Sequence, residues 1–384
     1  MASGRHRHSR RLDARGSAVP GPGLKSMRVA IRVDASKEIG TGHLVRCVAL
    51  AAALKKFGCE IRFVMRDLGL QVAKTLQSGG HSVELLPAPR SVMPHGCTGH
   101  AAWAGVDQIQ DAIETAENIG RPDWVVVDHY AFDSGWHSMV RARSGAAIAA
   151  IDDLADRPLA ADLIIDHNLH VDHRRKYAGI AGNALLLGGP RYALLSQRYA
   201  DAPRYVPCEE VRSIGIFMGG VDLGNISDRV LQGIDLAGFK GWVELVSTSS
   251  NPNLAELRQI VGRRSKTEIS VDLPDLSAFF AKHDLQIGAA GGATWERCCI
   301  GAPSLLLIVA ENQMSVAPAL FEQGIAAGVT PQRSLEVKDI RDAISALVRD
   351  PARRAILAER SRALVDGLGA LRVAEAMHEH RGSR

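Results

Sequence analysis

The chain alternates short apolar runs with longer segments in which apolar residues recur every three or four positions. A short apolar run predicts a buried strand, and the three-to-four spacing predicts a helix. Continuous apolar strands separated by helices indicate a parallel sheet covered on both faces. For the first half we expect strands at residues 29–34, 60–65, 82–86, 124–128, 146–152 and 161–166, and helices at 43–56, 70–78 and 106–119.

This alternation stops between residues 170 and 210, where Gly188, Gly189, Pro190, Pro203 and Pro207 occur, and it restarts at residue 213. We therefore predict two Rossmann-like α/β domains facing a cleft, with residues 27–205 in the first and 206–384, terminal helices included, in the second. In the second half we expect strands at residues 213–218, 243–247, 268–271, 285–288 and 304–309, and helices at 226–236, 254–261, 276–281, from about 294, and at 313–323, 337–349, 352–368 and 371–379.

Composition narrows the function classes. The 384 residues suffice for two domains that each bury a core. Residues 1–26 carry six basic residues and one acidic residue, so the remainder has a net charge of −1 within the total of +4. This tail, which has no apolar segment typical of a secretory signal, is expected to be disordered. A basic surplus confined to a tail does not indicate a nucleic-acid-binding face. No apolar run approaches the ~20 residues that cross a bilayer, so we expect no stable membrane insertion.

The cysteines and histidines give no sign of a metal site. The six cysteines include no Cys-x-x-Cys pair, which argues against a zinc site and a disulfide framework and favours a reducing, cytoplasmic setting. Two histidine-containing stretches, residues 95–100 and 167–173, lack the spacing of a known metal site, and we expect solvated loops there. We accordingly predict neither a metal nor another cofactor.

The stretch Gly40-Thr41-Gly42-His43 follows the first predicted strand and opens a predicted helix. The backbone N–H groups of a helix's first turn attract anions and lower the pKa of a nearby imidazole. His43, kept neutral there, is a candidate general base near pH 7. The alternative is a buried histidine that closes a loop. By residue type, Asp128 and His129 compete with His43 for a catalytic role.

Loops in the second half also follow predicted strands and carry small or polar residues. Glycines at strand ends let phosphate oxygens approach the backbone, and helix N-termini add donors. Neither a P-loop nor a dinucleotide fingerprint is present. The loops are nevertheless compatible with binding a ligand that contains a diphosphate. Glu296 is placed to accept ribose hydroxyls, whereas Asn312 and Gln313 are either helix caps or donors into the cleft. Each loop could also be an ordinary strand–helix turn. The candidate binding residues are Gly219, Gly220, Asp222, Gly291, Gly292, Thr294, Glu296, Asn312 and Gln313.

Ordered motifs between residues 27 and about 330 resemble a known enzyme family. They include the segments Val33–Ser36 and Ile39–His43 with Arg46, Asp128-His129-Tyr130, Ile151-Asp152-Asp153, 162–168, 187–194, Met218–Asp222 with Asn225, 249–254 and Glu311-Asn312-Gln313. Together they resemble the UDP-2,4-diacetamido-2,4,6-trideoxy-β-L-altropyranose hydrolases of pseudaminic acid biosynthesis. The basic tail and residues 87–105 are additional to that family's pattern.

The resemblance implies a glycosyltransferase-B (GT-B) architecture in which the second domain holds the UDP of a small UDP-sugar substrate. It further implies an inverting, metal-independent hydrolysis, with His43 as the base, Gly42 leaving room at the anomeric carbon, Tyr130 lining the sugar site and Asn312 contacting substrate. Residues 330–384 are expected to return to brace the first domain, as in related glycosyltransferases. Two alternatives remain: a UDP-sugar-dependent glycosyltransferase of the same architecture and a non-catalytic nucleotide-sugar-binding protein. Protein partners are not predicted.

Overall fold

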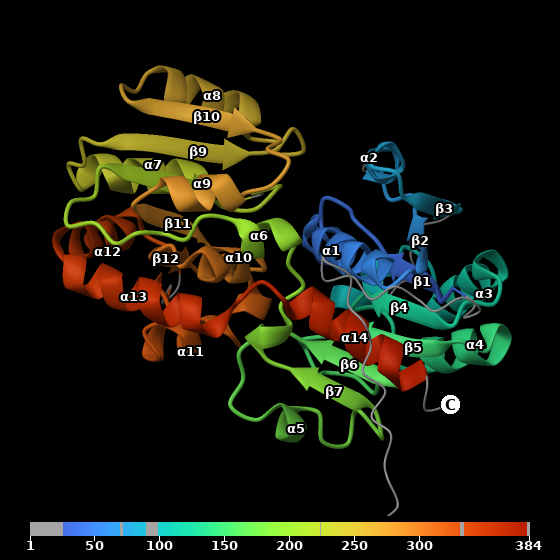
Figure 1. The fold of residues 1–384 in the computed structure, drawn as a ribbon. Helices are drawn as coiled ribbons and strands as arrows, with labels where there is room; N and C mark the ends of the chain where they lie inside the picture. The colour runs from blue at the N-terminus through green and yellow to red at the C-terminus, as the bar shows by residue number, and fades with distance from the viewer. Residues whose placement is uncertain (1–25, 70–71, 90–98, 223, 331–333, 382–384) are drawn as a thin grey trace, which may run out of the picture.

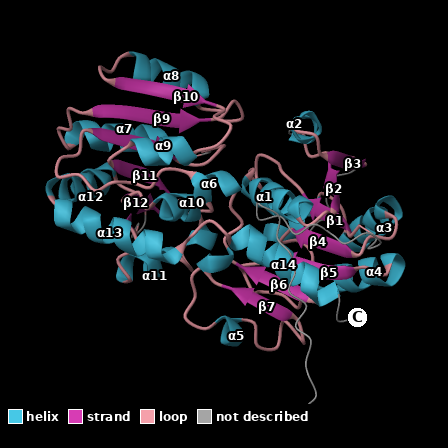
Figure 2. Cartoon of the chain, viewed as in Figure 1, coloured by secondary structure: helices cyan, strands magenta, loops and turns pink. Residues whose placement is uncertain are grey.

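The computed structural model describes residues 26–69, 72–89, 99–222, 224–330 and 334–381 (Figure 1). The predicted disorder of residues 1–26 therefore concerns a stretch that lies, apart from Ser26, outside the described residues. The chain forms two α/β halves, each with a parallel sheet flanked by helices (Figure 2). None of the described helices combines the length and the apolarity needed to cross a membrane.

The first sheet has, among the described residues, seven parallel strands in the order β3-β2-β1-β4-β5-β6-β7. Its central strands are apolar and fully buried, as expected for a sheet covered on both faces. The strands are β1 (Arg28–Val33), β2 (Glu60–Arg66), β3 (Ser82–Leu86), β4 (Trp124–Asp128), β5 (Ala147–Ile151), β6 (Leu163–Asp166) and β7 (Leu185–Gly188).

The second sheet has six parallel strands in the described residues, in the order β10-β9-β8-β11-β12-β13. In both sheets the strand order reverses beside the first strand, and ligands of open α/β sheets bind at such switch points. The strands are β8 (Ser213–Phe217), β9 (Trp242–Ser247), β10 (Thr267–Val271), β11 (Leu285–Ala289), β12 (Ser304–Leu307) and β13 (Ala327–Val329).

The helices largely follow the apolar spacing, with several differences at their ends. The helix expected at 313–323 is split into a 3₁₀ turn and α11, because Pro318 fits only the first turn of a helix. The α-helices are α1 (Gly42–Lys56), α2 (Val72–Ser78), α3 (Gln108–Ile119), α4 (Ser134–Ser144), α5 (His173–Lys176), α6 (Gln197–Asp201), α7 (Ile226–Leu236), α8 (Leu254–Gly262), α9 (Ser277–Lys282), α10 (Ala293–Ile300), α11 (Ala317–Glu322), α12 (Val337–Arg349), α13 (Pro351–Leu364) and α14 (Gly369–Arg381); the 3₁₀ turns are η1 (Gly99–Ala104), η2 (Pro190–Tyr192) and η3 (Glu311–Gln313).

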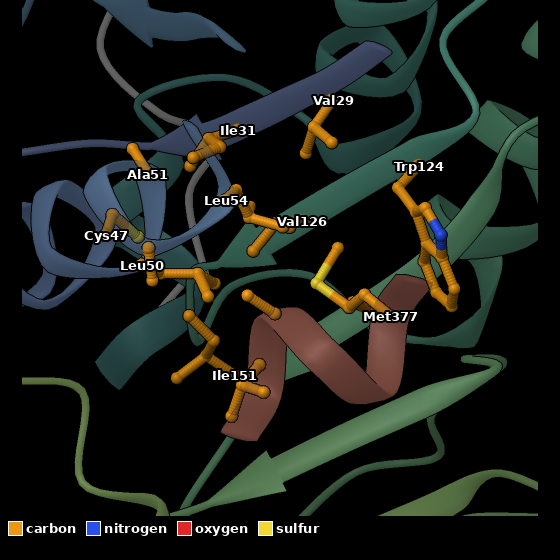
Figure 3. Close-up of a cluster of buried hydrophobic side chains, with 14 of the residues drawn as sticks. Val29, Ile31, Cys47, Leu50, Ala51, Leu54, Trp124, Val126, Ile151 and Met377 are labelled. Atoms are coloured by element: carbon orange, nitrogen blue, oxygen red, sulfur yellow. The ribbon is translucent and has the colours of Figure 1, made fainter. Parts of the chain in front are cut away.

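The last helix returns to the first domain. Met377 and Val373 on α14 are fully buried in the same core as Leu54 of α1 and Val126 of β4. Figure 3 shows Met377 lying between Val126 and Trp124. This packing agrees with the expectation for residues 369–381 alone, because Ile340 of α12 and Leu357 of α13 are buried in the core of the second half.

The chain passes between the halves twice, and the two passages touch each other (Figure 1). Gly369, at the start of α14, lies so close to Ala193 that an added Cβ would be 2.3 Å from the carbonyl oxygen of that residue. Gly367 has a positive φ of 83° and packs in the same way against Ala200. Glycine is required at this crossing because no side chain fits between the two backbones.

A fully buried ion network stiffens the first sheet on the side away from α14. Arg32 on β1 donates to Asp34 and to Asp111 of α3, and Arg66 at the end of β2 also donates to Asp111. The indole N–H of Trp136 on α4 donates to the same Asp111 carboxylate at 3.0 Å. Burial opposes ionisation of Asp111, yet the two guanidinium groups lower its pKa, so the carboxylate stays charged.

Candidate functional site

His43 and Asp128 lie at the carboxyl edge of two paired strands. Asp128 ends β4 and pairs in register with Val33 of β1, and eight residues separate the end of β1 from the start of α1. His43 Nδ1 lies 2.6 Å from Asp128 Oδ1. Asp128 and His43, considered above as competing candidates for a catalytic role, thus form a pair.

Arg46 holds the other side of the Asp128 carboxylate. Its Nε lies 2.6 Å from Oδ2 and its Nη2 lies 2.6 Å from Oδ1. Cys47 Sγ adds a contact of 3.5 Å to Oδ2. His43, Arg46 and Cys47 reach one carboxylate because residues three and four apart share a helix face. Sequence reasoning included Arg46 only as part of a motif, although this spacing was visible.

The carboxylate determines which nitrogen of His43 carries a proton. Burial would raise the pKa of Asp128, but Arg46 and His43 lower that pKa well below its usual range. An ionised Asp128 oxygen at 2.6 Å accepts Nδ1–H, which leaves the lone pair on Nε2. A histidine in this tautomer can accept a proton through Nε2 while the carboxylate stabilises the resulting imidazolium.

Tyr130 packs against the His43 imidazole and is fixed by its own carboxylate. The two ring centroids are 4.8 Å apart in an edge-to-face arrangement. The Tyr130 hydroxyl donates to Asp153, whose other oxygen accepts from Asn168 Nδ2 at 2.8 Å. Burial, together with Asp153, raises the pKa of Tyr130 well above its usual value, so the phenol is neutral. Asp153 therefore anchors Tyr130 beside His43.

Two histidines near this centre have other environments than expected. His167, predicted to lie in a solvated loop, is buried, and its Nε2 lies 3.4 Å from Arg46 Nη1. Burial and Arg46 lower the pKa of His167 to about 4, so it is neutral near pH 7. His129, the other predicted competitor of His43, faces away from it and places Nε2 3.3 Å from Asp34. Among the described residues, no cluster of three or more His, Cys, Asp or Glu side chains could hold a metal ion.

In the second domain, Gly219 and Gly220 follow β8 and reach the first domain. Gly219 has a φ of 96°, which favours glycine, and an added Cβ on Gly220 would lie 3.1 Å from Thr41 Oγ1. The Gly40–His43 loop and the Gly219-Gly220 loop thus face each other directly. Asp222 accepts from Ile226 N and Ser227 N, at 2.8 and 3.0 Å, so its carboxylate caps α7 in this structure.

The loop after β11 brings several predicted residues together. Gly291 and Gly292 precede α10, and the side-chain oxygen of Thr294 is buried without a hydrogen-bond partner among the described residues. An added Cβ on Gly291 would lie 3.6 Å from Gln313 Nε2, so the η3 turn adjoins this loop. Gln313 Oε1 accepts from Val309 N at 2.9 Å. The predicted contact of Asn312 cannot be placed, because its side chain lies outside the described residues.

Glu296 and its neighbour Trp295 face in different directions. Burial raises the pKa of Glu296 to about 7, against the lowering effect of a hydrogen bond with Tyr199 of α6. Its predicted contact with a ribose stays a prediction. Trp295 Nε1 donates to Asn168 Oδ1 at 3.1 Å, and Asn168 in turn donates to Asp153. Trp295 therefore connects the second-domain loop to the residues around His43.

Comparisons with known proteins support the architecture. No protein-family model matches the chain. The spore coat polysaccharide biosynthesis protein SpsG of Bacillus subtilis is 22% identical over 362 residues, which cover 92% of this chain and 98% of that protein. The UDP-2,4-diacetamido-2,4,6-trideoxy-β-L-altropyranose hydrolase of Campylobacter jejuni is 20% identical over 298 residues, covering 78% of this chain and 97% of that enzyme. These identities indicate a distant relationship.

Solved structures resemble the whole fold. MurG of Acinetobacter baumannii superposes with a TM-score of 0.63 at 14% identity, covering 92% of this chain and 99% of that one. The spinosyn forosaminyltransferase SpnP superposes with a TM-score of 0.61 at 15% identity, covering 93% and 100%. The chain has the GT-B architecture, as predicted.

Proposed function

We propose that this protein hydrolyses the bond between the sugar and the diphosphate of a UDP-sugar, and that the sugar is 2,4-diacetamido-2,4,6-trideoxy-β-L-altropyranose. The GT-B fold and the distant relatives support a nucleotide-sugar-processing enzyme. The observation that carries the proposal is the pair formed by His43 and the ionised Asp128. His43 belongs to the Gly40–His43 loop, which faces Gly220 of the second domain. The proposed enzyme works in the cytoplasm, without a metal or another cofactor.

In the proposed reaction, His43 Nε2 accepts a proton from a water molecule as its oxygen attacks the anomeric carbon. The carbon–oxygen bond to the β-phosphate breaks, and its electron pair leaves with UDP. Attack from the face opposite the leaving group inverts the anomeric carbon in one displacement. Asp128 stabilises the imidazolium, and the proton then passes to solvent. UDP is a good leaving group, so the site needs a positioned base more than a general acid.

The second-domain loops would hold the UDP. Backbone N–H groups after Gly219-Gly220 and at the start of α10 suit a diphosphate, and the hydroxyl of Thr294 is buried beside them. Asp222 is part of this proposed site as the residue that fixes the start of α7. Glu296, Gln313 and Asn312 are proposed to contact the nucleoside and the sugar, and Gly42 and Tyr130 to line the sugar side.

Two other functions remain candidates. The likeness to SpnP, whose name is that of a sugar transferase, favours a UDP-sugar-dependent glycosyltransferase as the second candidate. A non-catalytic nucleotide-sugar-binding protein is the third, although a His–Asp pair is not needed for binding alone.

One experiment separates the three functions. The protein is incubated with the UDP-sugar in ¹⁸O-labelled water without an acceptor, and free UDP and the position of the label are measured. We expect UDP release with the label on the sugar. Label on phosphate contradicts attack at carbon. No turnover without an acceptor favours transfer, and no turnover with any acceptor favours a binding protein.

The base is tested in the same assay with His43→Asn. Loss of a positioned base should lower turnover by ~10²–10⁴-fold while UDP binding is retained. His170→Asn is the matched control, because His170 is an exposed histidine in the same domain. Normal hydrolysis by His43→Asn would show that another group is the base.

A further inference from the structure

The short 3₁₀ turn η1 adds two aromatic side chains to the surroundings of His43. The Trp103 ring lies 6.0 Å from the His43 ring and 5.5 Å from the Tyr130 ring, measured between centroids. His100 lies 4.6 Å from Trp103 and 5.1 Å from Tyr130. These two residues belong to the segment 87–105, which is additional to the pattern of the family that the sequence resembles. Four rings from three parts of the chain therefore form one cluster.

The turn is fixed to the body of the domain directly after Trp103. Ala104 is buried in the core that contains Leu86 and Val64. Gly105 has a φ of 68°, and an added Cβ would lie 2.6 Å from the Pro89 ring, so the backbone lies close against that residue. These contacts set the position of Trp103 relative to the end of the sheet.

The four rings differ in exposure. His43 and Tyr130 are buried, whereas Trp103 and His100 are each partly exposed. An aromatic face binds the C–H edges and methyl groups of a sugar by apolar contact, but it offers no partner to a hydroxyl. A sugar held next to His43 therefore meets the indole of Trp103 on the η1 side. The nearby carboxylates of Asp128 and Asp153 are already engaged by Arg46, Tyr130 and Asn168.

We propose that Trp103, supported by His100, is a specificity-determining residue that selects sugars with methyl-bearing substituents, such as a 6-deoxy carbon or N-acetyl groups, over polyhydroxylated sugars. This inference rests on the proposed function of the His43 site and adds the residue that recognises the sugar. One methyl-sized contact in an apolar pocket discriminates by about 10–200-fold. Trp103→Ala should accordingly affect the diacetamido-trideoxy sugar more than a sugar with a 6-hydroxyl.

The test compares kcat/KM for UDP-2,4-diacetamido-2,4,6-trideoxy-β-L-altropyranose and for UDP-glucose, whose sugar has neither an N-acetyl group nor a 6-deoxy carbon. We expect Trp103→Ala to lower the ratio of the two kcat/KM values by about 10–100-fold. Trp103→Phe should retain most of the parent ratio, and inhibition by UDP should be unchanged in both variants. Trp242→Ala is the control, because Trp242 is 40% exposed on the second domain. Equal losses for both substrates, or an unchanged ratio, would overturn the assignment.

A binding measurement keeps this inference separate from the proposed reaction. In a chain carrying His43→Asn, calorimetry measures the affinities for UDP and for the diacetamido-trideoxy UDP-sugar. We expect the sugar to add affinity beyond UDP alone, and Trp103→Ala to remove about 10-fold or more of that gain. If the parent protein does not hydrolyse the UDP-sugar but the gain in affinity depends on Trp103, the proposed hydrolysis is wrong. The assignment of Trp103 as a residue that recognises the sugar is then still supported. If Trp103→Ala leaves the gain in affinity unchanged, Trp103 does not recognise the sugar.

Discussion

The His43 imidazole is held by the Asp128 carboxylate, with Nδ1 2.6 Å from Oδ1. The two residues are 85 positions apart in the chain, and the pairing of β1 with β4 brings them together. The carboxylate accepts Nδ1–H, and this contact both orients the ring and selects the tautomer with a lone pair on Nε2. The activity of His43 should therefore depend on Asp128.

We expect Asp128→Asn to lower kcat by ~10²–10⁴-fold, because an amide can stabilise the wrong tautomer and cannot neutralise the imidazolium. The steady-state assay is run beside calorimetry with UDP, whose affinity should be unchanged. Because the substitution also leaves Arg46 without its carboxylate, the folded fraction is measured by circular dichroism. A folded variant with the parent kcat would remove Asp128 from the proposed mechanism.

Asp111→Ala should destabilise the protein by about 3–5 kcal/mol, because it leaves the buried guanidinium groups of Arg32 and Arg66 without a shared partner. Asp342→Ala is the matched control, since Asp342 forms an exposed ion pair with Arg341. Exposed pairs contribute about 0–1 kcal/mol. Urea unfolding followed by circular dichroism measures both. Similar losses for the two variants would contradict the special role of the buried network.

Glu296→Gln should remove a pH dependence of stability. The pKa of Glu296 is raised from 4.5 to about 7 by burial, so the folded protein binds this proton more tightly than the unfolded chain. The resulting stabilisation is complete below pH 4.5 and is lost as the pH rises to about 7. Urea midpoints between pH 5 and 8 should therefore fall less steeply with pH in the variant. Glu256→Gln, at an exposed acid of α8, should follow the parent curve.

The hydrogen bond from Trp295 to Asn168 should couple the two domains energetically. A double-mutant cycle with Trp295→Phe and Asn168→Ala should give an interaction energy of about 1 kcal/mol. Denaturant unfolding measures the interaction energy in stability. Values of kcat/KM measure it in catalysis, because Asn168 also positions Asp153 beside Tyr130. Strictly additive effects in both measurements would mean that this hydrogen bond does not couple the two domains.

The strand–helix alternation predicted most of the fold because the apolar period is a local property of the sequence. It missed β7 and α4, and also the short helices α5 and α6. Residues 185–188 lie in the region where glycine and proline interrupt the pattern, and the polar sequence of α4 has only a weak apolar face. The short β13 was missed as well, since three residues carry no period.

The candidate site could be proposed from the sequence where it lies on one short loop, and less so where it depends on pairing between strands. His43 and the glycines could be identified because they follow predicted strands. The partnership with Asp128, the burial of His167 and the role of Asp153 depend on which strand ends lie side by side, and register cannot be deduced from a local pattern. Trp103 could not be identified, because nothing in its own segment shows that it faces His43.

The return of α14 to the first domain has a consequence for synthesis on the ribosome. Domains of a nascent chain usually fold in order from the N-terminus. Here the core around Val126 remains without Val373 and Met377 until residues 369–381 have been translated. The first lobe to emerge is therefore the last to be completed, and a fragment ending before residue 369 would expose that apolar surface. To be stable in isolation, the first domain would have to be produced with α14 fused to it.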